Sequence, residues 1–279
     1  MKVREAVEKL KEYQRVNFKD SSIRNYNITL KTFDETFGGK DVTDVTSENV
    51  SSFLVGSTAN LAQNTRHLRF TQVKAFFNFC INIMEIKFIN PCATRLMNKT
   101  FKGVKNRKRP TISKDVIDEM IYQAIKSRDR LLIEIQARGG LRIGEVLKLK
   151  CKDIEGRKIT LQSPKSGNQQ EQAFLPTTVS EKIKSFIAEA NLEANDMLFG
   201  LSYSAARNIV VKSGKRIGVS IRPHDLRRHA ATYASRNGVP LEVVSKIILR
   251  HQNLSTTQIY LGKISDYEAL HWIDSLYDK

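Results

Sequence analysis

Apolar residues recur every three or four positions along most of this chain, and this spacing constrains its fold most strongly. Between the hydroxyl residues at 21–22 and the glycines at 38–39, the apolar positions on one helical face are Ile23, Tyr26, Leu30, Phe33 and Phe37. Ser21 or Ser22 can cap this helix, and Gly38-Gly39 is expected to end it in the left-handed C-cap conformation. The sequence therefore predicts a mainly α-helical protein.

The first hundred residues contain three more segments with helical spacing. In the N-terminal one, the polar Gln14 occupies the apolar face that begins at Val3. The predicted helices run over residues 3–14, 48–54 and 64–83. Four helices of this size form a small bundle, so residues 1–98 are expected to be an N-terminal helical domain.

Basic residues gather where this bundle ends. From Leu61 to Pro110 the chain has 11 Lys and Arg and a single acid, Glu85. Proline keeps the residue before it out of helix, so residues 99–112 are expected to form an extended basic linker. A charge run is often only a solvated face, but this one continues back into a helix, which favours contact with a phosphate backbone. The residues that carry this expectation are Arg66, Arg69, Lys74, Lys105, Arg107, Lys108 and Arg109.

The second half, residues 113–279, is predicted to be helical with one β segment. Ser113 can cap its first helix, and Gly139-Gly140 can end the helix that begins at Leu131. Between Arg157 and Pro176 the runs KITLQ and AFLP flank a polar turn, SPKSGN, which predicts a β-hairpin. Further helices are expected over residues 142–149, 180–189, 203–212, 224–236, 241–249 and 266–277.

Composition narrows the classes of partner and compartment. The 279 residues carry 46 Lys and Arg against 29 Asp and Glu, a net charge of +17, which favours nucleic acid before a membrane surface. A merely soluble basic protein could have the same charge. No apolar run is long enough to span a membrane, and the N-terminus lacks the apolar core of a signal peptide. Cys80, Cys92 and Cys151 form no CxxC pair, which fits a reducing cytoplasm and argues against a zinc site.

The residues that could carry chemistry are cations and one tyrosine. The sequence has no phosphate loop, GxSxG elbow or metal-ligand cluster, so neither a metal nor a cofactor is expected. His224 and Arg227 share the first turn of a predicted helix, where backbone N–H groups favour an anion. Arg142 follows two glycines that let the chain approach a ligand closely, and Lys165 lies at the hairpin tip. Taken alone, each of these could be an ordinary surface residue, and Tyr260 a core aromatic.

The order of these residues resembles a known family. The segments GGLRIGEVLKL, SPKSGN, PHDLRRHAATYASRNG and LRHQNLSTTQIY are similar to motifs of the tyrosine recombinase (phage integrase) family, particularly its Xer-like members. The strong match covers about residues 139–262, whereas the N-terminal bundle resembles the family's SAM-like core-DNA-binding domain only in size and helix pattern. The family pattern falls on Arg142, Lys165, His224, Arg227, His251 and Tyr260.

The resemblance implies an α+β catalytic domain over residues 113–279 and a chemistry without metal or ATP. In this family a tyrosine attacks a DNA phosphodiester, forms a 3′-phosphotyrosyl bond and releases a 5′-hydroxyl, and an incoming 5′-hydroxyl reverses the step. Arg142 and Arg227 would clamp the non-bridging oxygens, because a guanidinium matches two phosphate oxygens. His224 would help accept the tyrosine proton, Lys165 would protonate the leaving oxygen, and His251 would donate to the phosphate.

Glu145 and Arg250 lie near motif residues in the sequence. Glu145 matches a family acid that supports the site, although it could also be a plain exposed helix glutamate. The family usually has a glycine before the second histidine, whereas this chain has Arg250, which could contact phosphate or face solvent. The interval from Gly238 to His251 also has one residue more than the common Xer-like spacing, so the 241–249 helix can end differently.

A C-terminal stripe indicates a final amphipathic helix. It would pack on its own domain or, as the resemblance implies, dock on a neighbouring protomer. The stripe consists of Tyr267, Leu270, Ile273, Leu276 and Tyr277.

The sequence as a whole favours a cytoplasmic recombinase that cleaves and rejoins double-stranded DNA at specific sites, for integration, excision or dimer resolution. The resemblance implies a tetrameric synaptic complex, with copies of itself or a related recombinase. One alternative is a DNA-binding regulator, because RNGVPLEVVSKIILRH can pass for part of a helix-turn-helix. Another is a relaxing enzyme of the type IB topoisomerase kind. Tyr260 and its five cationic partners argue against the regulator.

Overall fold

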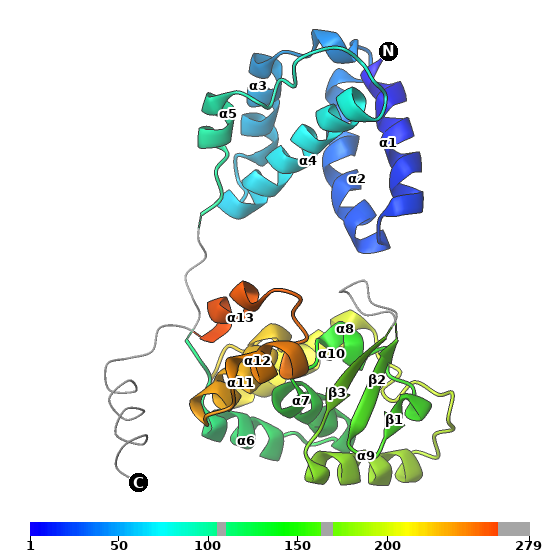
Figure 1. The fold of residues 1–279 in the computed structure, drawn as a ribbon, viewed down its shortest axis with the longest axis vertical. Coiled ribbons are helices and arrows are strands. Elements are labelled where there is room, and N and C mark those ends of the chain that lie inside the picture. The colour runs from blue at the N-terminus through cyan, green and yellow to red at the C-terminus, as the bar shows by residue number, and fades with distance from the viewer. Residues whose placement is uncertain (105–109, 163–169, 262–279) are drawn as a thin grey trace. The chain divides into compact units, whose positions relative to one another are not determined.

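The computed structural model describes residues 1–104, 110–162 and 170–261, with the backbone alone for 259–261. The chain divides into two compact units, Met1–Arg107 and Lys108–Lys279 (Figure 1). Each unit has a buried apolar core of its own. None of the helices in the described ranges is long and apolar enough to cross a membrane.

The first unit is built from helices around a core rich in phenylalanine. The ring of Phe33 contacts the rings of Phe37, Phe53, Phe76 and Phe77. Helix α4 packs against the three helices that precede it. Within residues 1–104 the elements are α1 (Val3–Asn17), α2 (Asp20–Phe37), the 3-10 turn η1 (Val42–Asp44), α3 (Ser47–Thr58), α4 (Gln63–Asn82) and α5 (Arg95–Thr100).

The apolar faces predicted for the first two helices are confirmed, and α2 ends at Gly38 as predicted, but the serine cap and the left-handed C-cap are wrong. Gln14 is fully buried with its apolar neighbours in α1. Helix α2 starts at Asp20 and has no side-chain cap, so neither serine caps it. Gly38 keeps a right-handed conformation with φ −52°. Glycine is needed there for space instead, because a Cβ would lie 2.5 Å from the Asp34 carbonyl oxygen.

The N-terminal core reaches further along the chain than the hydrophobic spacing indicated. Thr94 caps α5, and Phe101 directly after it is fully buried and stacks on Phe70. The start of the expected 99–112 linker therefore packs into the first unit. The basic residues at 105–109 lie outside the described residues.

The second unit places α7 at the centre of a helical layer, in contact with α6, α9, α10 and α11. Ser113 caps α6 as predicted, and Gly140 ends α7 in the left-handed conformation with φ +63°. Within 110–162 and 170–261 the helices are α6 (Lys114–Tyr122), α7 (Ser127–Gly139), α8 (Ile143–Val146), the 3-10 turn η2 (Cys151–Asp153), α9 (Thr177–Glu189), α10 (Tyr203–Arg216), α11 (Pro223–Arg236), α12 (Leu241–Val243), the π-helix η3 (Val244–Ile248) and α13 (Leu254–Leu261).

A small antiparallel sheet confirms the predicted β segment and extends it. Strands β2 (Lys158–Gln162) and β3 (Gln170–Phe174) pair in the register Lys158–Phe174 through Gln162–Gln170. A short strand, β1 (Ile154–Glu155), adds to the edge of β2. Two residues are too few to show alternation, so β1 could not be predicted. The mainly helical fold with a small sheet is as expected.

Two predicted helices differ from the structure. The 142–149 segment is helical only as α8, and the 241–249 segment divides into α12 and the π-helix η3. A π-helix takes up an extra residue within a helical turn, which suits the longer interval noted before His251. The predicted 266–277 helix lies outside the described residues.

Candidate active site

Arg142 donates two hydrogen bonds to Glu145 at the start of α8. The backbone N–H of Arg142 donates to Glu145 Oε2 at 2.8 Å, and its Nη1 donates to Oε1 at 2.5 Å. The Arg142 side chain is 28% exposed, whereas that of Glu145 is 8% exposed. Burial raises the pKa of Glu145, but the charge of Arg250 and the bonds from Arg142 bring it below its ordinary value. Glu145 is therefore a buried carboxylate, and the exposed-glutamate alternative is wrong.

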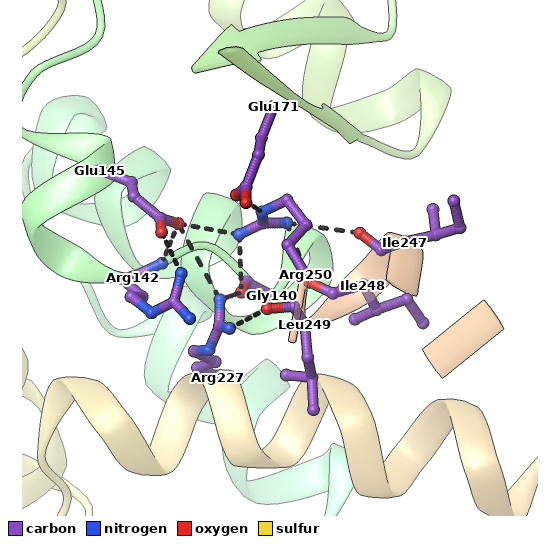
Figure 2. Close-up of polar contacts among 9 residues, drawn as sticks. All are labelled: Gly140, Arg142, Glu145, Glu171, Arg227, Ile247, Ile248, Leu249 and Arg250. Carbon is purple, nitrogen blue, oxygen red and sulfur yellow. Dashed lines mark hydrogen bonds and ion pairs between the residues drawn. The ribbon is translucent and has the colours of Figure 1, made fainter. Parts of the chain in front are cut away.

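Arg227 of α11 lies beside the same carboxylate, and its side chain is only 1% exposed. Its Nη1 donates to the Gly140 carbonyl at 2.5 Å, and its Nη2 donates to the carbonyl of Leu249. Nη1 also lies 3.9 Å from Glu145 Oε2 (Figure 2). The guanidinium thus joins α11 to the turn after α7 and to the end of η3, and the carboxylate of Glu145 lies beside both arginines.

The two predicted histidines adjoin these arginines. His224 occupies the exposed first turn of α11, where loss of hydration and the charge of Arg227 lower its pKa below the ordinary value. His251 follows η3, and loss of hydration with the charges of Arg227, Arg142 and Arg250 lowers its pKa to about 4. Both imidazoles are therefore neutral at pH 7, and a neutral imidazole can accept a proton.

A buried hydroxyl pair orients His251. Nδ1 of His251 bonds to Thr257 Oγ1 at 2.9 Å, and this hydroxyl donates to Ser245 Oγ at 2.8 Å. Because Thr257 uses its proton on Ser245, the Nδ1 proton belongs to the histidine, and the neutral ring has an unprotonated Nε2. Thr257 and Ser245 are fully buried and join α13 to η3. Sequence reasoning missed both hydroxyls, since serine and threonine have no distinctive spacing there.

Arg250 does not face solvent, so that alternative is wrong. Its side chain is 3% exposed, and its Nη2 donates to Glu145 Oε2 at 2.8 Å. Its backbone has φ +48°, a left-handed conformation in which glycine is the usual residue. The sequence signal for this feature was the arginine itself, at a position where the resembling family usually has glycine.

Two predicted catalytic residues have side chains outside the described residues. Lys165 falls between β2 and β3, within the gap at 163–169. Tyr260 lies near the end of α13, for which the structure describes the backbone. Helix α13 packs against α11 and η3, the elements that carry His224, Arg227 and the residues before His251.

The basic residues of α4 are partly engaged within the first unit. Nη1 of Arg69 donates to the Asn25 carbonyl at 3.0 Å and to Thr29 Oγ1 at 2.9 Å, which joins α2 to α4. Lys74 donates to Asn98 Oδ1 at 3.0 Å. Arg66 is half-buried. Lys105, Arg107, Lys108 and Arg109 lie outside the described residues, and DNA contact by this group stays a prediction.

Gly140 supports the site, so its replacement by alanine should destabilise the protein. A Cβ there would lie 2.8 Å from Ile248 Cγ2 and 2.9 Å from the Ile248 carbonyl oxygen. The left-handed backbone alone costs an L-residue about 1–2 kcal/mol, and the overlap adds to it. We expect Gly140→Ala to lower the free energy of unfolding by about 2 kcal/mol or more in chemical denaturation.

Gly144→Ala is the matched control for this substitution. Gly144 lies in α8, and no atom would come within 4 Å of a Cβ added there. Alanine favours helix over glycine by up to about 1 kcal/mol, so this variant should be neutral or slightly more stable. Equal losses in both variants would contradict the tight packing of Gly140.

Acid should destabilise the protein through His251. In the unfolded chain this ring protonates with the ordinary pKa of 6.5, whereas in the folded protein it resists protonation down to about pH 4. Stability that is present above pH 6.5 is therefore lost as the pH falls toward 4. The melting temperature of His251→Asn should fall less over this range than that of the wild type. An NMR titration of His251 with a midpoint at 6 or above would contradict this.

The cluster has the components for binding a tetrahedral anion: guanidinium groups, two neutral imidazoles and an adjoining helix with a tyrosine. In the described part of the chain, no group of three or more His, Cys, Asp and Glu residues could hold a metal ion.

The sequence pattern of the phage integrase family matches residues 110–265, more than half of the chain. The chain therefore belongs to the phage integrase family, as its motifs indicated.

Curated relatives give the same assignment. The chain is 26% identical to tyrosine recombinase XerA of Saccharolobus solfataricus over 253 residues, which cover 88% of this chain and 84% of that protein. It is 25% identical to tyrosine recombinase XerC of Vibrio atlanticus over 261 residues, which cover 85% and 81%. Both alignments extend well beyond the catalytic motifs, and the Xer-like resemblance is confirmed.

Solved structures share the fold. The Tn1549 transposon integrase in complex with transposon right-end DNA matches with a TM-score of 0.75 at 14% identity and covers 100% of both chains. The XerH recombinase bound to a palindromic difH substrate matches with a TM-score of 0.70 at 20% identity and covers 98% of this chain and 84% of that one. At these identities the similarity concerns the fold alone.

Proposed function

We propose that this protein is a site-specific DNA recombinase that cleaves and rejoins strands through a covalent tyrosine intermediate. One observation carries the proposal. Arg142, Arg227, His224 and His251 form a single cluster, and the helix of Tyr260 packs against two of the elements that form it. A regulator that only binds DNA has no need for neutral histidines beside buried guanidinium groups. Family membership supports the same function.

The proposed reaction exchanges one phosphodiester for another. The phenolic oxygen of Tyr260 attacks phosphorus, the bond to the 5′-oxygen breaks, and the DNA 3′-phosphate stays on the tyrosine. A free phenol has a pKa near ~10, so it needs a proton acceptor at neutral pH, and the lowered pKa of His224 suits that role. Lys165 gives the departing 5′-oxygen its proton. Attack by a 5′-hydroxyl from another strand then reverses these steps.

The positive side chains stabilise the charge that develops on the phosphorane. Arg142 is half-buried and can reach a non-bridging oxygen directly. Arg227 is covered, so its contact with phosphate requires the segment at Leu249, whose carbonyl it binds, to open. His251 needs a second proton to donate from Nε2, and the negative charge of a bound phosphate favours that proton.

The partner and the assembly follow from the same proposal. The net charge of +17 and the basic segment that includes Arg66, Lys74 and residues 105–109 suit double-stranded DNA. Relatives of this fold were captured on DNA, and lambda integrase was captured as a dimer on its core site. We place this chain in a tetrameric synaptic complex, with residues 1–98 as the DNA-binding domain and 113–279 as the catalytic domain. Free, buried cysteines suit a cytoplasmic location.

Strand exchange between two duplexes tests this function. A duplex that the protein selects from a random-sequence DNA pool would be supplied in two lengths, one labelled, with EDTA present. The proposal predicts recombinant products that join the two lengths. Relaxation of a supercoiled plasmid carrying the same sequence, without exchange, would support the topoisomerase alternative. Binding without covalent products would support the regulator.

A further inference from the structure

The buried arginine at position 250 carries two costs that its contacts must offset. Its guanidinium is withdrawn from water, and its backbone is held at φ +48°. Burial of a charge is unfavourable, and so is a left-handed backbone conformation for a residue other than glycine. A strained residue of this kind is held in place by its surroundings, and such residues are often found next to functional sites.

Arg250 lies between two acids that come from different elements. Its Nη2 donates to Glu145 Oε2 at 2.8 Å, and its Nε lies 3.7 Å from Glu171 Oε2 (Figure 2). Glu145 belongs to α8, whereas Glu171 belongs to β3. The Glu171 side chain is 9% exposed, so both carboxylates are largely removed from water.

The same guanidinium also fixes the backbone around the site. Nη1 of Arg250 donates to the carbonyl of Ile248 at 2.9 Å, at the end of η3. Nη2 lies 3.4 Å from the Gly140 carbonyl, to which Arg227 also donates. Arg250 thus connects the turn after α7, the acid on α8, the strand β3 and the segment before His251.

The geometry points to Arg250 as a positioning residue that, paired with Glu171, holds Glu145 and thereby keeps Arg142 and Arg227 available for phosphate. This inference rests on the proposed function. Glu145 Oε2 accepts from Arg250, while Oε1 accepts from Arg142, and Arg227 stays at 3.9 Å. Without Arg250, the carboxylate of Glu145 would satisfy itself on the two remaining arginines and compete with phosphate for them. The carboxylate of Glu171 would also lose a positive charge that lies 3.7 Å from its Oε2.

A double-substitution cycle between Arg250→Gly and Glu171→Gln tests this role. Glycine suits φ +48°, so Arg250→Gly removes the guanidinium without backbone strain. At saturating DNA, we expect this variant to form the covalent complex with a nicked suicide duplex about tenfold more slowly, since one charged hydrogen-bonded contact is lost. Adding Glu171→Gln should restore at least about threefold, because it removes the negative charge that lay next to the lost guanidinium. Arg250→Lys keeps the charge but lacks the planar guanidinium with its several donors, so its cleavage rate should be intermediate.

Asn191→Gly is the matched control for the backbone conformation. Asn191 is exposed and has φ +49°, so the same change to glycine is made at a left-handed residue that carries no buried charge. It should leave the cleavage rate unchanged. The cycle is also measured by chemical denaturation, in which the same two substitutions should be coupled whether or not DNA is present.

Three outcomes would count against parts of this account. A wild type that forms no covalent complex contradicts the proposed function, while the coupling in unfolding still tests the contact of Arg250 with Glu171. If the wild type cleaves and Arg250→Gly cleaves equally fast, the positioning role is wrong. If the effects of the two substitutions on the cleavage rate simply multiply, Glu171 is not the partner of Arg250.

Discussion

Replacement of Arg142 by alanine should lower the rate of covalent-complex formation about 10²–10³-fold while DNA binding is retained. Arg142 is the more exposed of the two motif arginines, and its guanidinium is already aligned by Glu145. Loss of one preorganised donor to a developing oxyanion typically has an effect of this size. Binding should persist because many phosphate contacts along the duplex contribute to affinity. Single-turnover cleavage of a nicked duplex and gel-shift titration measure the two quantities.

Arg142→Lys separates charge from geometry in this prediction. Lysine keeps the positive charge but cannot contact two phosphate oxygens with one planar group. We expect it to recover only part of the lost rate. A lysine variant as fast as the wild type, or an alanine variant that loses binding and cleavage in parallel, would contradict a role for Arg142 at the phosphate.

The N-terminal helices could be predicted from the sequence because their faces are strongly periodic. The positions from Leu30 to Phe37 repeat at helical spacing, and their burial follows from that spacing alone. The left-handed end of α7 at Gly140 could be predicted equally well, because two glycines stand at the end of an apolar helix. The same reasoning was wrong for the conformation of Gly38, because a glycine at a helix end can be needed for close packing and not for a left-handed backbone.

The order of the motif residues could be predicted, but their environment could not. Burial of Arg227 and the sharing of Gly140 by two arginines depend on contacts across 87 and 110 residues of chain. The π-helix that accommodates the longer interval before His251 depends on tertiary packing as well. Local spacing holds no information about such contacts, so the buried position of Arg250 came only from the structure.

Replacement of Tyr260 by phenylalanine should abolish covalent attachment altogether. Phenylalanine keeps the ring but lacks the oxygen that would bond to phosphorus. Since the reaction has no other step that releases the 5′-end, the loss should be complete, beyond the 10²–10³-fold expected for Arg142→Ala. The folded structure and the affinity for DNA should be unchanged, which thermal melting and gel-shift titration check.

The most direct measurement of the central claim is a denaturing gel of the protein after incubation with an end-labelled suicide duplex, with EDTA present. The duplex carries the selected sequence and a nick, so that a short 5′-hydroxyl strand diffuses away after cleavage and the adduct accumulates. The account predicts a labelled protein–DNA band for the wild type, attached at Tyr260 by peptide mapping, and no such band for Tyr260→Phe. A band that persists in Tyr260→Phe, or one that forms only when Mg²⁺ is supplied, would contradict it.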